Sequence, residues 1–150
     1  GGGFPIGACL ATADAAKGMT VGVHGSTFGG NPLAMAVGLA AFTEISRPET
    51  LAHVNEVAGY LKQQLVGLAE RFPDVIVDVR GKGLLVGVKL VPNNREFMAL
   101  ARDTQQLLVA GGGDNCVRIL PPLNLTLDEA RLAISKFEGA LEAARAKAAA

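Results

Sequence analysis

The sequence has no net charge, because its 14 Lys and Arg residues equal its 14 Asp and Glu residues. A chain without a basic or acidic excess gives nucleic acid or an anionic membrane surface little electrostatic reason to bind. Its apolar stretches are also broken by Gly, Asn or charged residues well before the ~20 residues that a membrane span needs. We therefore expect no nucleic-acid partner and no membrane partner.

Cysteine is scarce, since the chain has only Cys9 and Cys116. The two thiols are far apart in sequence, have no metal-ligand spacing and lie among apolar residues. This usage is typical of small buried side chains in a reducing compartment, so we expect a cytoplasmic protein with both thiols buried. The first residues, Gly1 to Pro5, contain no basic and apolar leader, and we expect no signal peptide.

The familiar catalytic groupings are missing as well. No Ser-His-Asp or Cys-His arrangement can be recognised, and no cluster of His, Cys, Asp or Glu has metal-ligand spacing. We therefore expect no metal site and assign no catalytic residue to these 150 residues. The features that remain are of the binding type.

The composition is that of a globular protein, with 49% apolar and 19% charged residues. The sequence has 19 glycines, about twice the average usage of ~7%. They gather at residues 1–7, 25–30, 81–87 and 111–113, between segments that read as regular structure. Glycine at such junctions indicates backbone that approaches a ligand or adopts a positive φ.

Two parts of the chain differ in character. Asn31 followed by Pro32 predicts the start of a helix over residues 33–45, which is apolar on nearly every face and therefore needs cover from another part of a protein. From Ser46 onward the pattern predicts a compact α/β unit with a small antiparallel sheet and helices. The predicted domains are residues 1–45 and 46–150.

The second part is predicted in some detail. A capping box at 46–49 opens a helix that Pro73 ends; strands follow at 75–79 and 84–90. Asn94 is expected to cap a third helix, and residues 107–110 and 116–120 are expected to form a strand pair. A second capping box, Thr126 to Glu129, opens the last helix. The inward residues of the third helix are predicted to be Phe97, Leu100, Ala101 and Leu108.

Residues 24–32, His-Gly-Ser-Thr-Phe-Gly-Gly-Asn-Pro, are the first candidate site. The hydroxyls of Ser26 and Thr27 lie between glycines just before a helix N-terminus, an arrangement that suits a phosphate. The loop matches neither the Walker A pattern nor GxGxxG. The alternative interpretation is a turn followed by an N-cap.

Arg80-Gly-Lys-Gly83 is the second candidate. An arginine at the end of a strand can bind a carboxylate with two parallel hydrogen bonds. The alternative is a solvated hairpin turn. Arg118 alternates with apolar neighbours and is either a strand residue that extends to solvent or a second anion contact.

Together, the segments Gly1–Gly7, His24–Pro32 and Arg80–Leu85 resemble class III, fold-type I aminotransferases that depend on pyridoxal 5'-phosphate. Gly111–Leu123 is similar to the acetylornithine branch of this family. The resemblance runs along essentially the whole chain, in order. It implies the end of a fold-type I large domain followed by the small C-terminal domain.

The resemblance also implies roles for particular residues. The lysine that forms a Schiff base with the cofactor is expected a few residues before Gly1, so no catalytic residue lies in this chain. Thr27 is expected to bind the cofactor phosphate across the interface of a homodimer, and Ser26 to lie close to phosphate or substrate. Arg80 is expected to hold the substrate's α-carboxylate.

The implied reaction is transfer of an amino group from N2-acetyl-L-ornithine, in arginine biosynthesis, to 2-oxoglutarate. Ornithine, 4-aminobutyrate and succinyl-diaminopimelate are alternative donors, because enzymes for them share these motifs. The 150-residue segment is expected to be inactive alone. An alternative of another class is a non-catalytic α/β module that binds phosphate or another protein.

Overall fold

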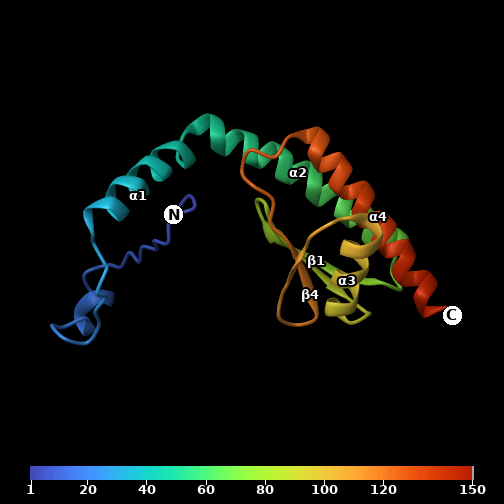
Figure 1. Ribbon diagram of the computed structural model, residues 1–150, viewed down its shortest axis with the longest axis horizontal. Coiled ribbons are helices and arrows are strands. Elements are labelled where there is room, and N and C mark those ends of the chain that lie inside the picture. The colour runs from blue at the N-terminus through green and yellow to red at the C-terminus, as the bar shows by residue number, and fades with distance from the viewer. Residues whose placement is uncertain (150) are drawn as a thin grey trace. The chain divides into compact units, whose positions relative to one another are not determined.

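The computed structural model describes residues 1–149 and divides into two compact units, Gly1–Pro48 and Glu49–Ala150. The ribbon is drawn in Figure 1, and each unit is considered by itself. None of the helices in the described part of the chain is long and apolar enough to cross a membrane.

The first unit contains a short 3-10 helix, η1 (Ala15–Gly18), and the helix α1 (Pro32–Ile45). The Asn31 side chain caps α1 by accepting a hydrogen bond from the Ala34 amide at 2.9 Å, which confirms the predicted start. Within α1 only Ala34 is buried. The large apolar side chains that it leaves exposed are Leu33, Met35, Leu39, Phe42 and Ile45.

The second unit is built on a four-stranded antiparallel sheet with the order β1-β2-β4-β3. The strands are β1 (Ile76–Lys82), β2 (Leu85–Leu90), β3 (Ala110–Gly111) and β4 (Cys116–Ile119). β1 and β2 form a hairpin, and β4 pairs with β2 although 25 residues separate the end of β2 from the start of β4 along the chain. This order confirms the predicted α/β class with a small antiparallel sheet.

Three helices pack on one face of this sheet: α2 (Pro48–Arg71), α3 (Asn94–Gln105) and α4 (Leu127–Ala148). The apolar stripe along α2 and the inward-facing apolar residues of α4 pack with the strands in one hydrophobic core. The spacing of apolar residues at three and four positions in these helices predicts this burial. At its centre the rings of Phe97 and Phe137 lie 5.4 Å apart. The Thr126 capping box opens α4 as predicted, with both reciprocal hydrogen bonds present.

Four local predictions are wrong. The capping box at 46–49 does not form, because Ser46 is the C-cap of α1 and its hydroxyl donates to the Thr43 carbonyl. The cap of α3 is Asn93, whose side chain accepts hydrogen bonds from the Arg95 and Glu96 amides, and Asn94 is the first helical residue. Leu108 is 82% exposed, because α3 ends at a left-handed Gln106 and in the stretch that follows Leu107 and Val109, on either side of Leu108, pack against the core. The third strand does not cover 107–110 but begins at Ala110.

Cys9 is also misassigned, since its side chain is exposed, whereas Cys116 is buried as expected. Cys9 lies in an extended stretch of the first unit that carries no helix or strand. A locally apolar sequence does not bury a residue unless another element packs against it.

Candidate functional site

The Ser-Thr loop is located immediately before α1. Two successive turns form it, because the Gly29 amide donates to the Ser26 carbonyl at 3.2 Å and the Asn31 amide to the Phe28 carbonyl at 3.3 Å. Gly30 has a φ of 73°, a conformation that favours glycine. Ser26 and Thr27 are exposed, and within the described residues neither hydroxyl has a hydrogen-bond partner. Both are therefore available to donate to a ligand.

A cavity of about 610 Å³ lies beside this loop within the first unit. The segment from Phe4 to Gly7 forms one wall, and Ser26, with the loop as far as Met35, forms the other. Thr27 is not among the lining residues, although it adjoins Ser26 in the chain. Two unpaired hydroxyls at the amino end of a 14-residue helix suit an anionic phosphate, because both the donors and the helix dipole favour negative charge. The loop thus fits the phosphate of pyridoxal phosphate.

The second candidate site is the outer face of the sheet in the second unit. Val88 and Val117 pair with each other and are fully buried in the core. Successive residues of a strand point to opposite faces, so the neighbouring row, Arg80–Gly87–Arg118, lies on the face away from the helices. Because Gly87 has no side chain, nothing in this row separates the two arginines.

Arg80 is held by Asp114 of the loop before β4 and by Cys116 of β4. Its Nη2 atom donates to Asp114 Oδ2 at 3.0 Å and to Cys116 Sγ at 3.3 Å. These hydrogen bonds, first the one to Asp114 and then the one to Cys116, raise the pKa of Arg80 above its usual value. A terminal guanidinium nitrogen has two N–H groups, so both donors of Nη2 are used. A substrate carboxylate that needs Nη2 must displace one of these partners.

Asp114 connects two basic side chains. Its Oδ1 atom accepts a hydrogen bond from Lys89 Nζ at 2.9 Å, while Oδ2 accepts from Arg80. The hydrogen bonds from Lys89 and then from Arg80 lower the pKa of Asp114. Asp114 is not among the candidate residues that the sequence indicates, and it lies in a turn with a φ of 56°. Its role as a counter-ion was missed because 34 residues separate it from Arg80.

Arg118 has a freer guanidinium. Its Nε atom donates to the Gly111 carbonyl at 3.0 Å, and among the described residues its two terminal nitrogens have no protein partner. Those two nitrogens form the end of the planar fork that can bind a carboxylate with parallel hydrogen bonds. Of the two alternatives for Arg118, the geometry therefore favours an anion contact anchored at its Nε atom.

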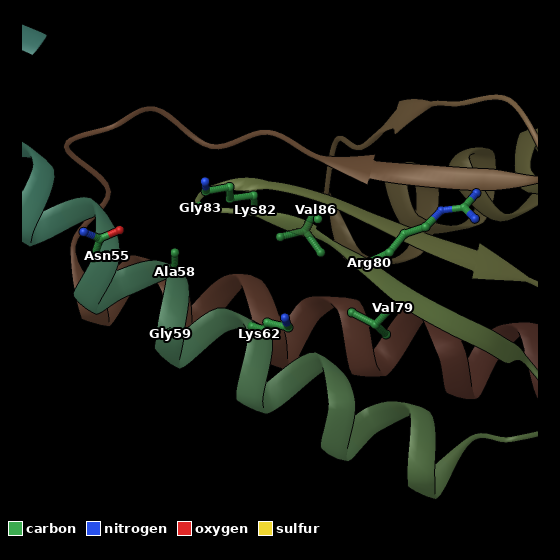
Figure 2. Close-up of a pocket in the computed structure, with 10 residues that line it drawn as sticks. Asn55, Ala58, Gly59, Lys62, Val79, Arg80, Lys82, Gly83 and Val86 are labelled. Carbon is green, nitrogen blue, oxygen red and sulfur yellow. The ribbon is translucent and has the colours of Figure 1, made fainter.

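A shallow groove of about 240 Å³ lies between α2 and the β1–β2 hairpin, with Asn55, Lys62 and Lys82 along it. Figure 2 shows that the Arg80 side chain extends away from Lys62. The end of the Arg80 side chain is therefore directed to the Asp114 side rather than into this groove. Gly81 and Gly83, both with positive φ, form the tight hairpin beside it.

Comparison with known proteins identifies the class. The family model for "Aminotransferase class-III" matches residues 1–141, so the chain belongs to this family of pyridoxal-phosphate-dependent aminotransferases. The chain is 74% identical over its whole length to acetylornithine aminotransferase 2 of Caulobacter vibrioides and covers 37% of that protein. It is 51% identical over 95% of its length to the acetylornithine aminotransferase of Brucella melitensis, of which it covers 35%. The chain thus spans little more than a third of these curated relatives.

The solved structures agree in fold. The acetylornithine aminotransferase of Elizabethkingia anophelis matches 83% of this chain with a TM-score of 0.72 and 28% identity, over 33% of its own length. The ornithine aminotransferase of Toxoplasma gondii matches 90% of this chain with a TM-score of 0.76 and 26% identity, over 32% of its own length. The predicted fold-type I class is thereby confirmed.

Proposed function

We propose that this chain is the C-terminal part of an enzyme that transfers an amino group from N2-acetyl-L-ornithine to 2-oxoglutarate. The observation that carries the proposal is the 74% identity to an acetylornithine aminotransferase over all 150 residues. Residues 1–45 form the end of the large cofactor-binding domain, and residues 46–150 form the small domain. The enzyme is a cytoplasmic homodimer that acts in arginine biosynthesis.

Ser26 and Thr27 would hold the cofactor phosphate. Their exposed, unpaired hydroxyls and the amino end of α1 support this role. Thr27 is exposed in this chain, as a residue that serves the partner subunit's cofactor across a dimer interface would be. When bound, pyridoxal phosphate supplies an electron sink for the carbanion formed at the substrate's Cα. The residues of this chain contribute binding and orientation.

The row Arg80–Gly87–Arg118 would receive the substrate's carboxylate. Arg80 is the contact that the resemblance implies from its RGKG motif. To bind a carboxylate through Nη2 it would exchange its hydrogen bond with Asp114, which keeps Lys89 as a partner. Arg118 is the second candidate, because its terminal nitrogens are already free. A planar guanidinium fixes both the position and the rotation of a carboxylate, which aligns the Cα–H bond for proton removal.

The test is a panel of amino donors on the full-length enzyme that carries this sequence. N2-acetyl-L-ornithine should give the highest kcat/KM with 2-oxoglutarate as acceptor. A higher value for ornithine, 4-aminobutyrate or succinyl-diaminopimelate would reassign the donor while keeping the class of reaction. No transamination with any of them, by a protein that is folded and loaded with pyridoxal phosphate, would favour a non-catalytic binding module.

A further inference from the structure

Loop 111–115, defined as Gly111 at the end of β3 together with the loop that joins it to β4, contacts both arginines of the outer sheet face. The Gly111 carbonyl accepts the hydrogen bond from Arg118 Nε at 3.0 Å, and Asp114 accepts the one from Arg80 Nη2 at 3.0 Å. The path of this loop therefore contributes to the position of both guanidinium groups, together with the pairing of Gly111 with Val117 and the hydrogen bond from Arg80 to Cys116. Any residue that holds the loop also acts on the two arginines.

The loop is held from the helix side by Asn94, the first residue of α3. The Asn94 Nδ2 atom donates to the Gly112 carbonyl at 3.1 Å and to the Cys116 carbonyl at 2.9 Å, so one amide group ties both ends of the loop. The Asn94 backbone amide also donates to Asn115 Oδ1 at 2.9 Å. Asn94 is half-buried, as expected of an amide whose donors are used inside the protein.

The loop needs such support because of its backbone. Asp114 and Asn115 both have positive φ values, 56° and 52°. Asp and Asn adopt this region more readily than other non-glycine residues, and they keep it where their surroundings hold them. The Asn115 side chain supplies part of that hold by donating to the carbonyls of Leu90 and Pro92 at 2.7 and 2.9 Å. Backbone hydrogen bonds from the Gly112 amide to the Cys116 carbonyl at 2.9 Å and from the Cys116 amide to the Gly113 carbonyl at 3.2 Å close the loop. Asn94 adds its two side-chain hydrogen bonds to the same segment.

We propose that Asn94 is a positioning residue for carboxylate binding: it fixes loop 111–115 and, through Gly111 and Asp114, orients Arg118 and Arg80. This inference rests on the proposed function of the arginine row. Asn94 is bonded to the backbone of the loop and has no bond to either guanidinium, so it acts on the substrate only through other residues.

The test is the Asn94→Ala variant of the full-length enzyme. Alanine keeps the backbone amide that bonds Asn115 and removes only the two side-chain hydrogen bonds to the loop. We expect the KM for 2-oxoglutarate to rise about 5- to 30-fold while kcat stays within about 3-fold, because a small misplacement of a binding group is costly even when the chemistry is remote. Asn94→Asp, which turns a carboxylate toward two carbonyls, should raise the KM at least as much. Affinity for pyridoxal phosphate should not change, since Ser26 and Thr27 lie in the other unit.

Asn93→Ala is the matched control. It changes the same residue type one position earlier and removes the α3 cap, but Asn93 has no bond to the loop. It should lower Tm without altering the KM. If Asn94→Ala raises the KM no more than Asn93→Ala does at a similar loss of Tm, Asn94 is only a structural residue.

Arg80→Ala and Arg118→Ala are measured in parallel. If neither raises the KM, the proposed carboxylate site is wrong. If either does while Asn94→Ala does not, the positioning role alone is wrong.

Discussion

Replacing Arg80 by alanine in the full-length enzyme separates two roles for this residue. If Arg80 binds the substrate's α-carboxylate, the variant loses a charge-assisted contact in the transition state. If Arg80 only forms an ion pair with Asp114, the variant loses that ion pair on the surface of the sheet. The side chains of Arg80 and Asp114 are 53% and 54% exposed, so solvent screens their interaction.

The two roles differ in magnitude. Truncating one partner of a bound charge pair costs about 2–5 kcal/mol, which lowers kcat/KM about 30-fold or more. Solvent screens an exposed ion pair, so losing the pair between Arg80 and Asp114 changes kcat/KM by less than about 6-fold. The ion pair between Arg80 and Asp114 also contributes to folding stability rather than to substrate binding. An effect above about 30-fold therefore identifies a contact.

The assay is steady-state kinetics with N2-acetyl-L-ornithine and 2-oxoglutarate for Arg80→Ala, Arg80→Lys and Arg118→Ala. Arg80→Lys keeps the charge but not the planar fork, and it should remain clearly impaired. Both half-reactions should be affected, because each substrate carries an α-carboxylate. A kcat/KM for Arg80→Ala within about 6-fold of the parent, together with a large loss in Arg118→Ala, would refute the assignment of Arg80 and transfer the contact to Arg118.

Three further variants test other parts of the structure. Thr27→Ala should weaken pyridoxal phosphate binding about 10- to 150-fold by loss of a hydrogen bond to a charged phosphate; equal affinity in a cofactor titration would leave the loop as a turn only. Thr126→Ala removes the cap of α4 and should cost about 0.5–2 kcal/mol in denaturant unfolding, whereas an unchanged midpoint would contradict the capping box. Arg145 hydrogen-bonds Asp74 and lowers its pKa below the usual 3.8, so this stabilisation is present above about pH 3.8 and is lost as the pH falls through the lowered pKa. Asp74→Asn should therefore reduce the acid dependence of unfolding below that pH, and an unchanged acid limb would show that the pair contributes nothing.

The sequence by itself determined the features that depend on neighbours along the chain. Pro32 after Asn31 marks the start of α1, and Thr126 with Glu129 marks the start of α4, because caps and proline act on the backbone within one turn. The apolar spacing of α2 predicts its buried stripe for the same reason. Family motifs in order along the chain indicated the family, the fold and the cofactor.

Only the tertiary structure decided which distant residues meet. His53 of α2 hydrogen-bonds the Leu125 carbonyl, 72 residues away in the sequence. Asn94, expected as a helix cap, instead ties loop 111–115, and the cap falls to Asn93. Asp114 reaches Arg80 only because β2 brings β4 and β1 into one sheet. Local patterns record the preferences of a segment, whereas such contacts depend on the path of the whole chain, which no single segment encodes.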